Sequence, residues 1–363
     1  MLRVAICGSG NRSRTVWQRH VRSLECFELV GVQDINPERL DQAQAMGLLT
    51  PEQRFTDLDL MLMRTRPEML IVCNVNAAHA AAVEAGLTAH CHVLVEKPFT
   101  TDLGDAVRLT ALAERRGLLL GVVQNWRTKS VGQALRAAIA QGAIGKVSHL
   151  FFRYVRDREL PSLPDYLFEE SDPLLWAMAI HHVDLFRYIL DQEIVHVEGH
   201  AFRPSWSRYR HPSGMQLWIE TAGGVVISYV GTFSSRNGHL PLESLQVEGE
   251  LGTLCNESAY SEPPLWLSRR GSEAMVDLTA AVRVRDRAGQ YDLGDLAILR
   301  NFHAAMTQGE SLVAPARDNV STLAVVEAAR LCVRQRHAVS PPELLAQAQL
   351  VPAGSAEATT RDG

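Results

Sequence analysis

The feature that most constrains the fold is an alternation of short apolar runs with helix-like segments across residues 2–125. The apolar runs read LRVAIC, ELVGVQD, MLIVCNVN, HVLVEKP and LLLGVVQN. Strands that are apolar along their whole length are typical of a parallel sheet whose two faces are both covered by helices. The sequence therefore predicts an α/β N-terminal domain built on a doubly wound parallel sheet.

Chain length and a change of pattern predict a second domain. A chain of 363 residues is long for a single core. After residue 124, strand-like runs follow one another with short turns between them, which is typical of an α+β domain with a large, mostly antiparallel open sheet. We expect domains at 1–124 and 125–340, followed by a disordered tail at 341–363 that ends in small polar residues.

Composition and charge exclude several classes of protein. A net charge of -5 and a pI near 6.2 give no broad cationic surface for nucleic acid or an anionic membrane. No apolar run approaches membrane-spanning length, and the start of the chain lacks the apolar region of a signal peptide. The six cysteines are scattered without a Cys-x-x-Cys pair, which favours a reducing compartment. These features predict a cytoplasmic protein with neither nucleic acid nor membrane as a partner.

A glycine-rich turn follows the first predicted strand. In Gly8-Ser9-Gly10-Asn11-Arg12-Ser13 the glycines let the backbone approach a pyrophosphate, and the helix that follows favours its negative charge. The turn alone fits an ordinary strand-helix connection equally well. Asp34 ends the second strand, where a carboxylate accepts hydrogen bonds from the ribose of a dinucleotide. The pair predicts a Rossmann cofactor site, with NAD favoured over NADP because Ile35 and Asn36 offer no cation for a 2′-phosphate.

Two further motifs carry ionisable groups. The strand VLVEKPF ends in Glu96, Lys97 and a proline, an ending that by itself also fits an exposed ion pair. His181 and Asp184 are three residues apart on a helix predicted near 174–190 and therefore share one face.

A metal site is not predicted at the adjacent histidines. His181 and His182 are neighbours on one helix, so their side chains diverge. Residues 90–92 read His-Cys-His, but no further ligands are evident near them. We therefore expect no metal.

Several motifs occur in the order and spacing of one known family. They are the glycine-rich turn, NVNAAH, VLVEKPF, NWR, GAIGKV and MAIHHVDLFRYIL. From residue 2 to about residue 340 the chain resembles the Gfo/Idh/MocA family, named for glucose-fructose oxidoreductase, inositol dehydrogenase and a rhizopine-catabolism protein. The resemblance implies an NAD-dependent dehydrogenase that moves a hydride between nicotinamide and a secondary alcohol or ketone of a sugar, cyclitol or related polyol.

The resemblance also assigns roles to residues. It implies that Lys97 and His181 handle the proton of the substrate hydroxyl, and that Pro98 follows a cis peptide. Substrate contacts are expected at Asp184, Arg127 and Tyr166, although Arg127 fits a salt bridge at the domain interface equally well. Besides the turn residues 8–12 and Asp34, the implied cofactor contacts are Asn74, Asn76, His79, Glu96, Lys97 and Asn125.

One position departs from the family pattern. Many catalytic members carry an aspartate four residues before the histidine, where this chain has Ala177. Asp172, Glu169 or Glu170 could orient His181 from another direction. The departure keeps two alternatives open: a non-catalytic NAD-binding sensor or regulator, and an enzyme that uses tightly held NAD to cleave glycosides.

Two loops and one sheet face complete the predictions. Residues 156–173 and 203–214 form polar, partly aromatic loops, which suit selection of a polyhydroxylated substrate but also fit ordinary surface loops. Alternating apolar residues in GMQLWIET and GVVISYVG predict an outward apolar face and hence a homodimer or homotetramer.

Overall fold

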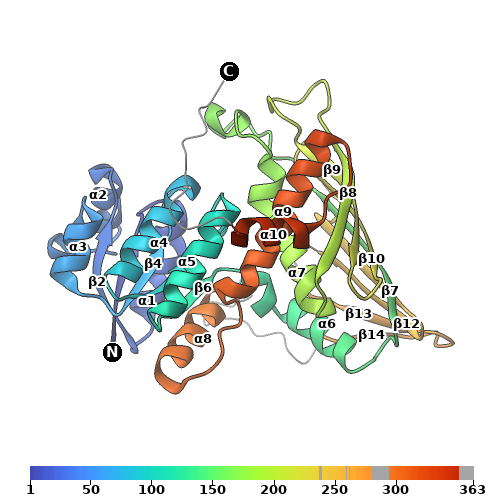
Figure 1. Ribbon diagram of the computed structural model, residues 1–363, viewed down its shortest axis with the longest axis horizontal. Helices are drawn as coiled ribbons and strands as arrows, with labels where there is room; N and C mark the ends of the chain where they lie inside the picture. The colour runs from blue at the N-terminus through green and yellow to red at the C-terminus, as the bar shows by residue number, and fades with distance from the viewer. Residues whose placement is uncertain (237–238, 259, 261, 280–293, 351–363) are drawn as a thin grey trace. The chain divides into compact units, whose positions relative to one another are not determined.

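A computed structural model describes residues 1–236, 239–258, 260, 262–279 and 294–350 (Figure 1). The chain divides into two compact units. The first contains Met1–Leu120 and resumes at Pro342, and the second is Gly121–Pro341. The division therefore falls a few residues before the predicted boundary at residue 124.

The first unit is built on a parallel sheet with strand order β3-β2-β1-β4-β5-β6. All four residues of β4 are fully buried. Because alternate side chains of a strand point to opposite faces, this burial means that both faces are covered, as the apolar runs predict. The strands are β1 (Leu2–Cys7), β2 (Phe27–Gln33), β3 (Arg54–Phe55), β4 (Met69–Val72), β5 (His92–Val95) and β6 (Leu120–Val122).

Local signals start the helices of the first unit. Pro37 is the first residue of α2, and the Asn36 side chain accepts a hydrogen bond from the Glu38 amide at 2.9 Å. Asp102 caps α5 in the same way through the Asp105 amide at 2.8 Å. The helices are α1 (Gln18–Ser23), preceded by a π-helical turn (Ser13–Trp17), α2 (Pro37–Ala45), α3 (Leu58–Thr65), α4 (His79–Thr88) and α5 (Leu103–Arg115).

The end of the chain corrects one prediction. Residues Pro341–Leu350 form helix α10, so the expectation of disorder from residue 341 is wrong for this stretch. Proline at the first helical position, Glu343 in the first turn and a run of leucine, alanine and glutamine all favour a helix. The rest of the predicted tail, 351–363, lies outside the described residues.

The second unit carries the larger sheet, with strand order β14-β13-β12-β11-β7-β10-β9-β8. The β7–β10 pair is parallel, and the other pairs for which a register is defined are antiparallel. The prediction of a mostly antiparallel sheet is confirmed. The strands are β7 (Val147–Val155), β8 (Ile194–Phe202), β9 (Gly214–Thr221), β10 (Val226–Thr232), β11 (Glu243–Gly249), β12 (Gly252–Ser258), β13 (Trp266–Arg269) and β14 (Met275–Asp277).

Helices cover one face of this sheet, where α7 and α9 lie in Figure 1. Under α7 the rings of Phe152, Tyr154, His182, Phe186 and Tyr229 form an aromatic core with neighbouring centroids 4.6 to 6.4 Å apart. The helices are α6 (Ser130–Ala140), α7 (Ile180–Leu190), α8 (Asp295–Gln308) and α9 (Ala316–Gln335); a π-helical turn (Leu175–Ala179) leads into α7.

The opposite face of the large sheet is only partly apolar. Met215, Leu217 and Ile219 of β9 are buried and face inward, whereas Trp218 lies outward, so only some apolar residues of this strand belong to the expected outward face. The outward positions include Phe151 and Trp218, each 46% exposed, which line a hollow of about 560 Å³ together with polar residues of β8 to β11.

Candidate active site

Gly8 makes the tight turn at the end of β1. Its φ is +97°, a region that favours glycine, and a β-carbon there would meet the Cys73 carbonyl oxygen at 2.5 Å. The turn lies where the strand order reverses between β1 and β4, the point at which such sheets bind ligands. At Gly10 no described neighbour lies within 4 Å of the place a β-carbon would occupy. The backbone at Gly10 is therefore open to a phosphate.

Asp34 closes this turn from the end of β2 and is buried. Its Oδ2 accepts a hydrogen bond from the Ser9 amide at 2.8 Å, and its Oδ1 accepts one from the Asn36 amide at 2.9 Å. Arg39 stands beside it, with Nη1 3.6 Å from Asp34 Oδ2. The expectation that no cation lies near Asp34 is wrong, because the first turn of α2 brings Arg39 back toward the carboxylate.

The other residues of the turn differ in exposure. Ser9 is fully buried, and its Oγ accepts from Gln18 Nε2 at 3.2 Å, so the side chain holds the turn together. Asn11 is exposed and Arg12 is half-buried. Cofactor contacts by these three residues remain predictions.

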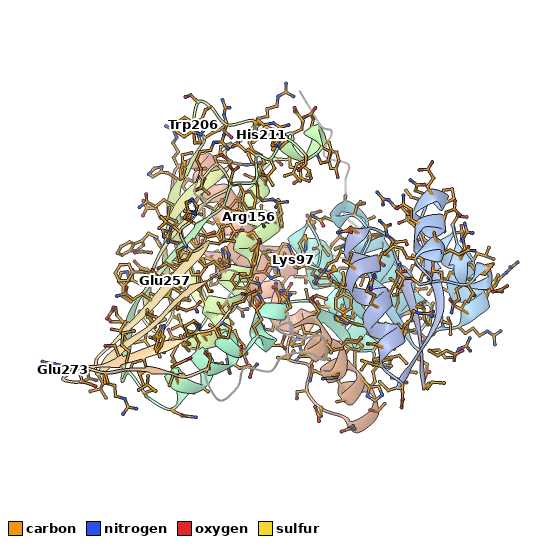
Figure 2. The ribbon with its side chains drawn as sticks, turned by 180° about the vertical axis from the view of Figure 1, so that it is seen from behind. Lys97, Arg156, Trp206, His211, Glu257 and Glu273 are labelled. Atoms are coloured by element: carbon orange, nitrogen blue, oxygen red, sulfur yellow. The ribbon has the colours of Figure 1, made fainter. Side chains whose placement is uncertain are left out.

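Glu96 and Lys97 follow β5 but do not form the exposed pair that the sequence left open. Glu96 is buried, and its Oε1 accepts from Arg12 Nε at 2.7 Å and from Trp17 Nε1 at 2.8 Å. The Lys97–Pro98 peptide is cis, as the resemblance implies. Lys97 is half-buried at the strand end (Figure 2). The carboxylate thus joins the glycine-rich turn to the strand that carries Lys97.

His79 holds the segment that follows β4. Its Nδ1–H donates to the Pro98 carbonyl at 2.6 Å, and Nε2 lies 3.3 Å from the Asn74 carbonyl. Burial lowers the pKa of His79, only partly offset by these carbonyls and Glu96, so the ring is neutral at pH 7. Asn74 is half-buried and Asn76 is exposed. The buried His79 side chain therefore positions the loop that carries Asn74, a predicted cofactor contact.

In the second unit, His181 stands near the start of α7 against a short turn (Asn125–Thr128). The Trp126 ring stacks on the His181 ring, with centroids 5.5 Å apart and planes 5° apart. His181 Nδ1 lies 3.2 Å from Gln124 Oε1. An amide oxygen accepts hydrogen bonds, so this contact places the proton on Nδ1 and makes Nε2 the acceptor atom of the neutral ring.

Gln124 is an orienting partner of His181 that the sequence interpretation did not identify. Ala177 belongs to the π-helical turn before α7 and brings no carboxylate. Two of the acids proposed as substitutes are engaged elsewhere: Glu169 Oε2 accepts from Arg210 at 2.6 Å, and Asp172 pairs with Arg334. An uncharged amide just past the end of β6 therefore contributes to the orientation of His181.

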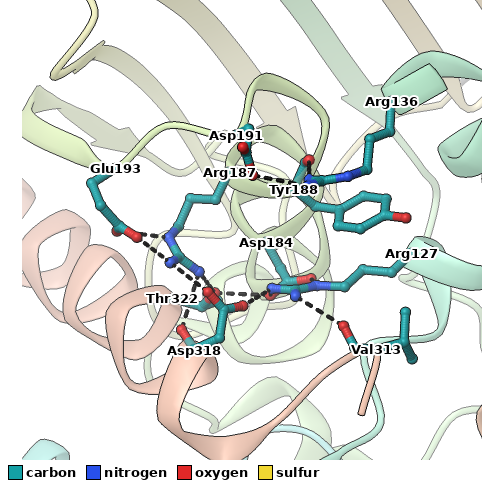
Figure 3. A network of polar contacts seen from close by, with 10 residues as sticks. All are labelled: Arg127, Arg136, Asp184, Arg187, Tyr188, Asp191, Glu193, Val313, Asp318 and Thr322. Atoms are coloured by element: carbon teal, nitrogen blue, oxygen red, sulfur yellow. Dashed lines mark hydrogen bonds and ion pairs between the residues drawn. The ribbon is translucent and has the colours of Figure 1, made fainter. Parts of the chain in front are cut away.

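Arg127 and Asp184 form a buried ion pair inside the second unit (Figure 3). Asp184 accepts from Arg127 Nε and Nη2, each at 2.7 Å, and from Thr322 Oγ1 at 2.8 Å. Arg127 is 5% exposed and Asp184 is 1% exposed. Arg127 thus forms a salt bridge within the second unit, and substrate contact by either residue remains a prediction that their burial does not favour.

The pair belongs to a larger network that joins three elements. Asp318 of α9 contacts Arg127 and accepts from Arg187 Nη2 at 2.9 Å, while Arg187 also binds Glu193 (Figure 3). Burial lowers the pKa of Arg127, but Asp184 and Asp318 more than offset it, so the pKa is raised overall. Burial raises the pKa of Asp318, and the two arginines bring it below its usual value. Arg127 and Asp318 are therefore charged at pH 7, and the network fixes α7 against the turn that follows Gln124.

Two predicted residues lie apart from these groups. Asn125 donates through Nδ2 to Asp295 Oδ1 at 3.0 Å, a contact within the second unit. Tyr166 lies in a 3-10 turn (Asp165–Phe168) and is 67% exposed. Their cofactor and substrate contacts remain predictions. The sequence interpretation assigned no role to Gln124, which precedes the NWR motif, or to Trp126, which lies within it.

The described residues include no group of three or more His, Cys, Asp or Glu side chains placed to hold a metal ion. In the same part of the chain, no helix is both long enough and apolar enough to cross a bilayer. All six cysteines are free thiols.

Comparison with known families now places the chain. A family model described as an oxidoreductase family with an NAD-binding Rossmann fold matches residues 2–124, and a GFO/IDH/MocA C-terminal domain matches residues 133–255. The chain belongs to the Gfo/Idh/MocA family. It is an oxidoreductase-family protein with an NAD-binding domain, and the resemblance stated from the sequence is confirmed.

Members of the Gfo/Idh/MocA family with known names are similar to it over long stretches. A D-apiose dehydrogenase of Paraburkholderia graminis is 27% identical over 98% of this chain and 94% of its own. A D-glucoside 3-dehydrogenase of Escherichia coli is 28% identical over 65% of this chain and 68% of its own. An oxidoreductase from Agrobacterium radiobacter, solved with NAD+, L-tartaric acid and magnesium, shares the fold at a TM-score of 0.84 and 19% identity, over 94% of this chain and 99% of its own.

The first unit of this family member fits a dinucleotide. The positive φ of Gly8 and the open space at Gly10 leave room for a pyrophosphate, and Asp34 stands at the end of the neighbouring strand. In the described chain the buried Asn74 Oδ1 atom has no hydrogen-bond partner, so an acceptor remains for a ligand. These features suit NAD without requiring any displacement of the turn.

Proposed function

We propose that the protein is an NAD-dependent dehydrogenase acting on a secondary alcohol or ketone of a sugar, cyclitol or related polyol. The observation that carries this proposal is the fixed position of the His181 ring. The ring stacks on Trp126 and forms a hydrogen bond through Nδ1 with Gln124. A histidine fixed in one orientation and tautomer suits proton transfer. The named relatives include a D-apiose dehydrogenase and a myo-inositol 2-dehydrogenase, which favours this substrate class.

The roles of the residues follow from the reaction. Oxidation removes a hydride from carbon and a proton from the hydroxyl, and leaves a carbonyl. Bound NAD supplies the hydride acceptor. We assign the hydroxyl proton to His181 Nε2 and the stabilisation of negative charge on the hydroxyl oxygen to Lys97. Gly8, Gly10, Asp34 and Asn74 would hold the cofactor.

A screen of NADH formation tests the proposal. Purified protein is incubated with NAD+ and a panel of sugars, cyclitols and sugar acids, and NADH is followed by absorbance. We expect net NADH with at least one compound. NAD binding without turnover would indicate a sensor. With glycosides added to the panel, their cleavage without net NADH would indicate the glycoside-cleaving enzyme.

We further propose that the protein forms a homo-oligomer through the open face of the large sheet. Phe151 and Trp218 are large, apolar and about half exposed on this face, and they flank the hollow described above. Trp218→Lys should dissociate the oligomer, as measured by light scattering at micromolar concentration. A wild-type monomer under the same conditions would contradict the proposal.

A further inference from the structure

Two arginines beyond the end of β7 have no carboxylate partner in the described chain. Arg156 and Arg158 are half-buried, and neither guanidinium forms a salt bridge with a described acid; Arg156 donates a hydrogen bond to the uncharged Tyr154 hydroxyl. Other arginines of the second unit, such as Arg127 and Arg187, each bind carboxylates. A guanidinium carries five N–H donors in a fixed fork, and its strongest partners are carboxylates and phosphates.

Aromatic rings hold both guanidinium groups in place. The Arg156 guanidinium carbon lies 5.4 Å from the Tyr260 ring, and that of Arg158 lies 4.8 Å from the Phe233 ring. Phe233 in turn contacts Tyr154, with ring centroids 6.1 Å apart. Because the rings fix the positions of the two cations without neutralising them, the site is formed in advance of a ligand.

Nearby acids do not neutralise these cations by direct contact. Glu159 is already occupied, since it accepts from Ser207 at 2.7 Å, Ser234 at 2.6 Å and the Arg208 amide at 2.8 Å. Glu170 is exposed and Glu243 is buried, and neither forms a salt bridge with Arg156 or Arg158. The excess of positive charge therefore remains for a ligand.

Contacts within the second unit connect this site to His181. The Tyr154 ring lies 5.0 Å from the ring of His182, the residue after His181. Lys129 Nζ lies 4.9 Å from the Trp126 ring, which stacks on His181, and 5.8 Å from the Tyr260 ring that faces Arg156. Figure 2 shows Arg156 apart from Trp206 and His211, which lie on the 203–214 loop. The cations thus stand on the histidine's side of the unit.

We propose that Arg156 and Arg158 bind an anionic substituent of the substrate, so that the preferred substrate is a sugar acid or a sugar phosphate. This inference rests on the proposed function and narrows its substrate class. The carboxylate or phosphate is held at the arginine pair, and the hydroxyl that reacts lies elsewhere on the same molecule.

Matched substrate pairs test the inference. D-Gluconate is compared with D-glucitol, and D-glucose 6-phosphate with D-glucose, since each pair differs in an anionic group. We expect kcat/KM to favour one anionic member by about 10- to 100-fold, the range for one or two charge-assisted hydrogen bonds. The pair that shows the preference distinguishes a carboxylate from a phosphate. Equal values within both pairs, or a preference for the neutral members, would overturn the inference.

Variants locate the preference. Arg156→Gln and Arg158→Gln should each lower kcat/KM for the anionic member by about 10-fold or more and leave the neutral member nearly unchanged. Arg269→Gln, at an exposed arginine of β13, is the matched control and should change neither. An equal loss for both members of a pair would show a structural role and overturn the inference.

Calorimetry separates failure of this inference from failure of the proposed function. Gluconate and glucose 6-phosphate are titrated into the wild-type protein and into a double variant that carries Arg156→Gln and Arg158→Gln. Both proteins are saturated with NAD+ beforehand. Binding to wild type that is lost in the double variant supports the anion site even if no NADH forms. Weaker binding of NAD+ itself by the double variant would assign the arginines to the cofactor and overturn the inference.

Discussion

The two units build their functional groups in different ways. In the first unit, Gly8, Asp34 and Lys97 each stand at or just past the end of a strand, and short motifs mark all three positions. In the second unit, His181 depends on Gln124, 57 residues away, and Arg127 reaches Asp318 across 191 residues. A cofactor site can therefore be read from local sequence, whereas the setting of the histidine exists only after long-range packing.

The largest expected effect concerns Lys97, a residue of the first unit whose position is marked by a short sequence motif. Lys97→Met should lower turnover by about 10² to 10⁴ and leave NAD+ binding nearly intact, since it removes a group that stabilises charge or transfers a proton. Steady-state kinetics and a fluorescence titration measure the two properties. Lys146→Met, at an exposed lysine of the second unit, should change neither. Parallel loss of cofactor binding would make Lys97 a structural or cofactor residue.

The next prediction concerns the buried ion pair of Arg127 and Asp184, which joins distant parts of the second unit. Asp184→Asn should destabilise the protein by about 3 to 5 kcal/mol, because it leaves the charge of Arg127 buried without its main partner. Urea unfolding measures the loss. Asp191→Asn is the matched control: Asp191 pairs with Arg136 at 2.9 Å but is 81% exposed, so its pair contributes about 1 kcal/mol or less. Equal losses in the two variants would show that burial does not set the strength of the network.

The next largest effect is expected from removing the hydrogen bond between Gln124 and His181. Gln124→Met should lower turnover by about 10- to 100-fold without weakening NAD+ binding, because the ring loses the acceptor that fixes its orientation. Gln124→Glu keeps an acceptor at the same distance and should restore much of the rate. Side-chain ¹⁵N NMR should show the Nδ1–H tautomer of His181 in wild type and a mixture in Gln124→Met. A reversed tautomer in wild type would mean that the amide donates to the ring.

A buried carboxylate should make the loops of the second unit sensitive to acid. Burial raises the pKa of Glu159, but hydrogen bonds from Ser234, the Arg208 amide and Ser207, with the charge of Arg236, bring it below its usual value. This stabilisation is present above the unfolded pKa, about 4.3, and is lost as pH falls through the lower folded value. Glu159→Gln should cost about 1 to 3 kcal/mol at pH 7. In urea unfolding, a difference from wild type that did not shrink below about pH 4 would contradict this account.

The smallest expected effect concerns cofactor choice in the first unit. Wild type should bind NADH more tightly than NADPH, since the Asp34 carboxylate repels a 2′-phosphate. Arg39 offsets part of that repulsion, so Arg39→Ala should weaken NADPH binding by about 5-fold, equivalent to about 1 kcal/mol, and change NADH binding little. Fluorescence titration compares both with Arg64→Ala, at an exposed arginine of α3. Equal or tighter NADPH binding by wild type would refute the preference for NAD.

The same contrast explains what the sequence could predict. Apolar runs indicate strands of both sheets, and the run GMQLWIET coincides with β9. The glycine-rich turn and the Glu-Lys-Pro strand end are short enough to be recognised as motifs. Arg39 escaped notice because it approaches Asp34 only once α2 has formed its first turn.

Residues of the second unit were harder to predict for a related reason. Gln124 and Trp126 are unremarkable as residue types, and their importance arises only when α7 packs against the turn that carries them. The charged residues Arg187, Glu193 and Asp318 look like ordinary helix and loop surface in the sequence. Their burial depends on contacts between α7 and α9, which no local pattern encodes.

The chain leaves the first unit after Leu120 and resumes it at Pro342, so the second unit is one uninterrupted insertion. Replacing the second unit with that of a relative therefore requires only two crossover points in the sequence, one at each end of the stretch. Gly8, Asp34 and Lys97 would stay with the recipient, while His181 would travel together with the glutamine and the ion pair that hold it. One recombination event of this kind can bring a new substrate preference to an inherited cofactor site without separating the histidine from its support.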